Sequence, residues 1–128
     1  MSKILIVDDD PIIRQLVKNY FTAKGHQVTA AVDGKDGIEK FKAGDFNLLI
    51  ADLMMPVLHG YQLIDFVRNH VKGKSMPILL LTADRKEPVM ETYDRRGYED
   101  DYLAKPFDVP TLEKKVNELL AEAADREV

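Results

Sequence analysis

The strongest constraint on the fold is a regular alternation of two kinds of segment. Short runs that are apolar at every position, such as Ile4–Val7 and Ile78–Leu81, alternate with longer stretches whose apolar residues recur at helical spacing. Strands without a polar side are typical of parallel sheets that helices cover on both faces. The sequence therefore predicts an α/β fold. The five expected strands are Lys3–Val7, Gln27–Ala31, Asn47–Ala51, Pro77–Leu81 and Asp101–Ala104.

Five helices are expected between and after these strands. The first has apolar residues at positions 12, 13, 16, 17, 20 and 21, with Asp10 as its N-cap and Pro11 as its first residue. The others are expected around Ile38 and Phe41, around Leu63 to Val67, from about Pro88 to Arg96, and around Leu112 to Ala123. Four glycines are expected to end helices in the left-handed conformation: Gly25, Gly44, Gly73 and Gly97.

Length and composition limit the class of protein. The 128 residues are typical of one domain, and no Ser/Gly/Pro-rich stretch divides them. The chain has no cysteine, which excludes disulfides and thiolate metal sites, and no apolar run approaches the roughly 18 residues of a membrane span. A net charge of −4 disfavours non-specific binding to nucleic acid. We expect a single domain over residues 1–128, in the cytoplasm, without membrane insertion and with no output domain in this chain.

Chemically capable side chains follow the expected strands. Asp8 and Asp9 follow the first strand, Asp52 the third, Thr82 the fourth and Lys105 the fifth. Ligands of open parallel sheets bind beyond the carboxyl ends of the strands, where the strand order reverses. In a doubly wound, flavodoxin-like sheet of order 2-1-3-4-5, the first and third strands are neighbours. The three carboxylates would then share one pocket.

The chemistry of such a pocket follows from its charge. Crowded carboxylates repel one another unless protons or a cation are present, and an all-oxygen site with few protein ligands favours Mg²⁺. A bound Mg²⁺ would bring a phosphoryl group close to Asp52, where Lys105 could offer a charge and Thr82 a hydroxyl donor. The pattern predicts phosphoryl transfer to the Asp52 carboxylate. Helix capping explains Asp10, and a turn before Gly34 explains Asp33, so neither is assigned to the metal site.

The motifs also resemble a known family over essentially the whole chain. The segments are Val7–Pro11, Asp52–Pro56 followed by Gly60, Leu81–Ala83 and Asp101–Phe107. In this order they resemble the receiver domain of two-component response regulators, and the stand-alone chemotaxis type most of all. Such domains are signalling modules rather than enzymes.

The resemblance implies specific roles. Asp52 would accept a phosphoryl group from a sensor histidine kinase or a histidine phosphotransfer protein, and the backbone carbonyl of Met54 would be a further Mg²⁺ ligand. Tyr102 would be an aromatic switch that responds to Thr82 and changes the face of the fourth helix, fifth strand and fifth helix, where a downstream protein binds. A cis Lys105–Pro106 peptide bond is implied, and a monomer or a phosphorylation-dependent dimer.

In this family the positions of Met54 and Asp84 tune how long the phosphoryl group survives. Met54 cannot orient a water molecule and Asp84 could, so the hypothesis is an intermediate to long lifetime. The sequence departs from the family at His59, where the family usually has an aspartate. We expect His59 to be an exposed loop residue. It also departs at Tyr98–Glu99, where one residue more than usual is present.

Four alternatives remain. The chain could be the receiver portion of a longer regulator or hybrid kinase. A Mg²⁺-dependent aspartyl-phosphate phosphatase would need a second acid at Met54. A flavin-binding electron carrier would have to bind its phosphate beside Asp8 and Asp9, which would repel it. A receiver that only binds partners would not need Asp52, Thr82 and Lys105 together.

Overall fold

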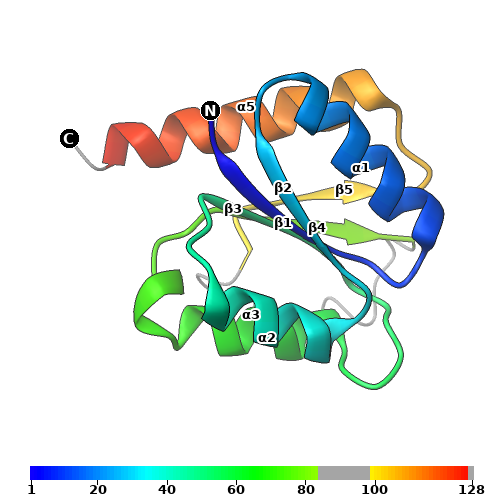
Figure 1. Cartoon of the computed structure of the whole chain (residues 1–128), viewed down its shortest axis with the longest axis vertical. Coiled ribbons are helices and arrows are strands. Elements are labelled where there is room, and N and C mark those ends of the chain that lie inside the picture. The colour runs from blue at the N-terminus through cyan, green and yellow to red at the C-terminus, as the bar shows by residue number, and fades with distance from the viewer. Residues whose placement is uncertain (84–98, 127–128) are drawn as a thin grey trace.

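The computed structural model describes residues 1–83 and 99–126 (Figure 1). Five parallel strands form one sheet in the order β2-β1-β3-β4-β5, as predicted. The strands are β1 (Lys3–Val7), β2 (Gln27–Ala31), β3 (Leu48–Asp52), β4 (Ile78–Thr82) and β5 (Asp101–Ala104). The helices are α1 (Pro11–Ala23), α2 (Gly34–Ala43), α3 (Gly60–Arg68), the 3₁₀ turn η1 (Val71–Gly73) and α5 (Val109–Arg126). The expected helix near residues 88–96 lies outside the described residues.

The sheet is covered on both faces, which confirms the doubly wound fold. Helices α1 and α5 lie on one face and α2 and α3 on the other (Figure 1). Successive residues of a strand point to opposite faces, so Ile4 and Ile6 pack in the core on the α1 and α5 side, whereas Leu5 and Val7 pack on the other. This explains why the segments Ile4–Val7, Leu48–Ala51 and Ile78–Leu81 are apolar at every position. None of the described helices is both long and apolar enough to cross a membrane.

The helix ends confirm some of the predicted signals and correct others. The Asp10 side chain accepts a hydrogen bond of 2.9 Å from the Ile12 N–H, and Pro11 is the first residue of α1. Gly25 follows this helix with φ +96°, as predicted. The predictions for Gly44 and Gly73 are wrong. Gly44 caps α2 in an extended conformation (φ −128°), and α3 already ends before Asn69.

Gly73 serves a different purpose, because it lies inside η1 and a Cβ atom there would collide with the Val67 carbonyl oxygen. A close approach between two backbone segments therefore requires this glycine, rather than a left-handed turn. Gly97 lies outside the described residues.

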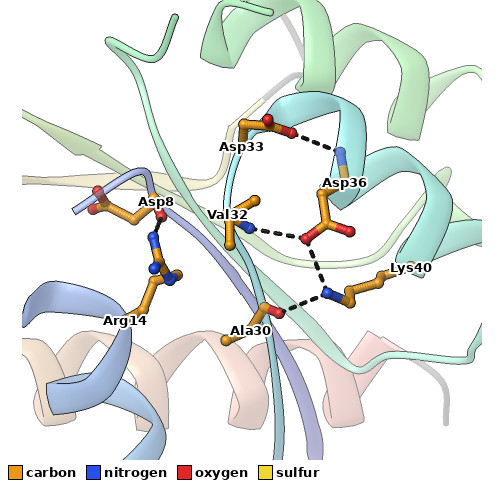
Figure 2. A network of polar contacts seen from close by, with 7 residues as sticks. All are labelled: Asp8, Arg14, Ala30, Val32, Asp33, Asp36 and Lys40. Carbon is orange, nitrogen blue, oxygen red and sulfur yellow. Dashed lines mark hydrogen bonds and ion pairs between the residues drawn. The ribbon is translucent and has the colours of Figure 1, made fainter. Parts of the chain in front are cut away.

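At the exposed β2 edge of the sheet, side chains of α2 form hydrogen bonds with outward-facing backbone groups (Figure 2). Ala31 faces β1, where its carbonyl accepts from the Asp8 N–H, so Ala30 and Val32 face outward. Lys40 Nζ donates to the Ala30 carbonyl at 3.1 Å, and Asp36 accepts from the Val32 N–H at 3.0 Å. Because Asp36 and Lys40 also pair with each other at 2.9 Å, two outward-facing backbone groups are satisfied by one ion pair.

Candidate functional site

The predicted side chains meet at the carboxyl edge of the sheet. Asp8 and Asp9 follow β1, and Asp52 is the last residue of the neighbouring strand β3. One carboxylate oxygen from each of the three lies within 4.8 Å of the others. The three acids that the sequence predicts to share one pocket do lie together, although β3 and β4 each begin and end one residue later than predicted.

Lys105 reaches this acidic cluster from the end of β5. Its Nζ atom lies 2.9 Å from Asp8 Oδ2 and 3.5 Å from Asp52 Oδ1. Its backbone N–H donates to the Thr82 carbonyl at 2.7 Å, and the Lys105–Pro106 peptide bond is cis, as expected. Burial alone would lower the Lys105 pKa, but the hydrogen bond and charge of Asp8, with the charge of Asp52, raise it above its usual value. The side chain is therefore a cation at neutral pH.

Every polar atom of Asp8 has a partner. Its carboxylate accepts from the Asp10 N–H at 2.9 Å and from Lys105 Nζ. Its N–H donates to the Ala31 carbonyl at 3.3 Å, and its own carbonyl accepts from Arg14 Nη1 at 2.8 Å. The residue is fully buried, so these contacts hold a charged side chain in one orientation.

Asp52 has an unfavourable charge in the metal-free protein. Burial, followed by the negative charge of Asp8, raises the pKa of Asp52 to about 6. Lys105 and a hydrogen bond from the Met54 backbone act in the opposite direction, but they do not outweigh burial. Above pH 6 the cluster therefore holds carboxylates with more negative charge than Lys105 can neutralise.

This excess of negative charge fits a divalent cation. Three carboxylate oxygens are hard ligands of the kind that Mg²⁺ prefers, and the ion keeps several water molecules rather than needing a full protein cage. Asp9 is exposed, which leaves the cluster open to solvent on its side. These side chains are therefore suited to bind Mg²⁺, because the ion would relieve the repulsion among the carboxylates.

The remaining predicted residues that the structure describes lie on β4, on β5 and in the loop after β3. Thr82, buried, ends β4 one position beyond Leu81, the residue in register with Asp52. Met54 lies in the loop after β3 with 54% of its surface exposed, and Tyr102 on β5 is 43% exposed. Asp84 lies outside the described residues.

His59 corrects the prediction of an exposed loop residue. It is half-buried and caps α3: its Nδ1 accepts from the Tyr61 N–H at 3.2 Å, while the Gln62 side chain accepts from the His59 N–H at 2.7 Å. Burial lowers its pKa, so the neutral acceptor form is favoured. The sequence contains a signal for this cap, because His59 is followed three positions later by Gln62, which is the spacing of a capping box.

The loop between β3 and α3 contains a strained residue. Val57 has φ +70°, and the Leu58 N–H donates to the Pro56 carbonyl at 2.7 Å across it. A β-branched residue at positive φ is unfavourable, because its side chain crowds the backbone. The side chain is 85% exposed and contributes little packing in return.

Val57→Gly is therefore expected to stabilise the protein by about 0.5–1 kcal/mol, since relief of strain exceeds the extra entropy of the unfolded chain. Val71→Gly is a matched control, because Val71 is 79% exposed and has no positive φ. Val71→Gly should therefore destabilise the protein. Urea unfolding of both variants measures the free energy of unfolding, and changes of the same sign in the two variants would refute the strain at Val57.

Three comparisons place the chain among known proteins. A family model, the response regulator receiver domain, matches residues 4–117. A curated relative, the probable transcriptional regulator ycf27 of Porphyridium aerugineum, is 36% identical over 123 residues, covering 93% of this chain and 48% of the relative. The chain therefore spans about half the length of that relative.

Two solved structures are similar over nearly their whole length. The chemotaxis response regulator CheY4 of Vibrio cholerae is 33% identical with a TM-score of 0.85, covering 93% of this chain and 98% of that one. The response regulator TrrA of Thermotoga maritima, in complex with Mg²⁺-BeF, is 33% identical with a TM-score of 0.81, covering 93% and 99%. With its fold and its cluster of acids at the switch point of the sheet, the chain belongs to the response regulator receiver domain family of two-component systems.

Proposed function

We propose that Asp52 accepts a phosphoryl group from a phosphohistidine of a sensor histidine kinase or of a phosphotransfer protein. Mg²⁺ would be bound by Asp8, Asp9, Asp52 and the backbone carbonyl of Met54. The observation that carries this is the meeting of three carboxylates within 4.8 Å beside the Lys105 ammonium. The Mg²⁺-BeF complex of the similar TrrA protein supports the choice of metal.

The transfer needs an ionised Asp52. One of its oxygens forms a bond to phosphorus while the bond from phosphorus to the histidine nitrogen breaks, and the electron pair stays on that nitrogen. The product on this chain is an acyl phosphate. Because the Asp52 pKa is about 6, the nucleophile is largely ionised at pH 7.5 even without metal.

Lys105 and Thr82 would act on the transferred group. Lys105 Nζ, 3.5 Å from Asp52, is close enough to pair with a phosphoryl oxygen as negative charge accumulates there. Thr82, at the end of β4, offers a hydroxyl donor at the same edge. Bound Mg²⁺ would supply further neutralisation of that charge.

The output of the domain would lie on β5 and α5. Tyr102 is exposed there and lines a groove of about 410 Å³ with Phe107 and Thr111. An inward turn of Tyr102 after phosphorylation would change this surface and its affinity for a downstream protein. We propose that residues 1–128 act as one receiver domain in the cytoplasm, as a signalling module that binds proteins.

The test is mass spectrometry of the intact protein after incubation with acetyl phosphate and Mg²⁺. The wild type should gain one phosphoryl adduct that is stable in acid and lost in base. The adduct should be absent in the Asp52→Asn variant and after chelation of Mg²⁺. Asp108→Asn, which changes an exposed aspartate of the same type, should be labelled like the wild type. An unlabelled wild type, or a labelled Asp52→Asn variant, would refute the proposal.

A further inference from the structure

Arg14 is the one cation of α1 that contacts the acidic cluster directly among the described residues. It is half-buried, and its Nη1 atom donates to the backbone carbonyl of Asp8 at 2.8 Å. Figure 2 shows this carbonyl facing Arg14, while the Asp8 carboxylate points away from it. The guanidinium therefore contacts the backbone of the cluster and leaves the Asp8 carboxylate to Lys105 and the Asp10 N–H.

The contact fixes a peptide plane that carries two candidate metal ligands. The Asp8 carbonyl belongs to the peptide unit between Asp8 and Asp9, so its direction also sets where the Asp9 side chain leaves the backbone. Asp9 needs this support, since no hydrogen bond holds its exposed carboxylate within residues 1–83 and 99–126. Without Arg14, the buried Asp8 carbonyl would lose its partner and the peptide unit could rotate toward water.

The charge of Arg14 also acts on Asp36 of α2. Hydrogen bonds from the Lys40 side chain and the Val32 backbone lower the pKa of Asp36, and the charge of Arg14 adds the smallest contribution in the same direction. The Asp36 carboxylate is fixed in turn by the Val32 N–H and by Lys40 Nζ (Figure 2). Arg14 therefore touches the Asp8–Asp9 peptide directly, and Asp36 acts on the guanidinium only through a weak attraction between their charges.

We propose that Arg14 is a positioning residue that fixes the Asp8–Asp9 peptide and thereby strengthens Mg²⁺ binding by the acidic cluster. The inference rests on the proposed function for the identity of the metal. Groups that orient metal ligands without touching the metal change its affinity by about 10–100-fold when they are removed.

The sign of the effect separates positioning from simple charge. Arg14 is a cation beside an anionic site, so its charge alone opposes Mg²⁺, and Arg14→Met would tighten binding if only charge acted. Positioning predicts the reverse, a loss of about 10-fold in Mg²⁺ affinity. Arg14→Lys keeps the charge but lacks the reach and the fork of the guanidinium, so it too should bind Mg²⁺ more weakly than the wild type.

The experiment is a calorimetric titration of the full chain with Mg²⁺ alone, at fixed ionic strength, for the wild type and both Arg14 variants. Two controls are on the same helix. Lys18→Met removes an exposed cation, and Tyr20→Phe removes one partly buried hydrogen bond, the 2.6 Å bond to Glu113. Both should bind Mg²⁺ within about 2-fold of the wild type, since neither contacts the Asp8–Asp9 peptide.

Amide hydrogen exchange in the metal-free proteins gives a second measurement. The Asp10 N–H, which donates to the Asp8 carboxylate, should exchange faster in Arg14→Met than in Tyr20→Phe. Unchanged or tighter Mg²⁺ binding by Arg14→Met, or equal loss in Tyr20→Phe, would overturn the positioning role and leave the proposed function intact. A wild type that binds no Mg²⁺ would refute both.

Discussion

Asp52→Asn is expected to raise the melting temperature of the metal-free protein at pH 8 by about 6 °C, and to lose most of this gain at pH 4. The pKa of Asp52 in the folded protein, about 6, lies above its ordinary value of 3.8. A raised carboxyl pKa means that the fold favours the protonated form. The stability of the wild type is therefore retained at low pH and falls as the pH rises through 6, whereas asparagine stays neutral throughout.

The expected gain at pH 8 is about 1–2 kcal/mol, less than the full pKa shift would give, since the cluster is open to water beside Asp9. Asp108→Asn is the matched control. Hydrogen bonds from Thr111 lower the pKa of Asp108, so removal of its charge should give no gain at either pH. Thermal unfolding at pH 4 and pH 8 in the presence of a chelator measures both variants. If Asp52→Asn raised the melting temperature equally at the two pH values, the gain could not come from the unfavourable ionisation of a buried Asp52 beside Asp8.

The strand pattern could be predicted closely because it depends on local burial. The three inner strands each contain a run of four apolar residues, and three of the five strands have the predicted bounds. The other two, β3 and β4, extend one residue further, to Asp52 and Thr82. A rule that ends a strand at the first polar residue fails there, because these two polar side chains are buried at the candidate site. The two strands whose ends were predicted one residue too early are therefore the strands that end in Asp52 and Thr82.

Contacts between distant segments could not be predicted in the same way. The sequence suggested that Gly73 ends a helix, but its role depends on the approach of the Val67 backbone. Arg14 was not identified as part of the site, because nothing in its spacing indicates that its guanidinium reaches the Asp8 carbonyl. Acids at strand ends can be found by position along the chain, whereas the groups that hold them require the packed structure.

Gly60→Ala is expected to lower the melting temperature by about 10 °C and to slow phosphorylation of Asp52. Gly60 donates its N–H to the Leu53 carbonyl at 2.8 Å, which brings the start of α3 against the end of β3. A Cβ atom at Gly60 would collide with the Asp52 carbonyl oxygen and lie 2.7 Å from Leu53 Cα. Both neighbours are backbone atoms, so the methyl group can be accommodated only by moving the acceptor strand or the helix, at about 2–4 kcal/mol.

Gly25→Ala separates this local effect from a general loss of stability. Gly25 has φ +96° and open space around its Cα, so alanine there costs about 1 kcal/mol through backbone strain alone. Gly25 also lies just before β2, at the edge of the sheet opposite the acids. Its variant should therefore melt earlier but accept phosphate from acetyl phosphate at the wild-type rate at 20 °C, where both variants are still folded. A Gly60→Ala variant with the wild-type rate would mean that α3 moves and Asp52 does not, so the glycine would protect the packing of the helix rather than the position of the acceptor.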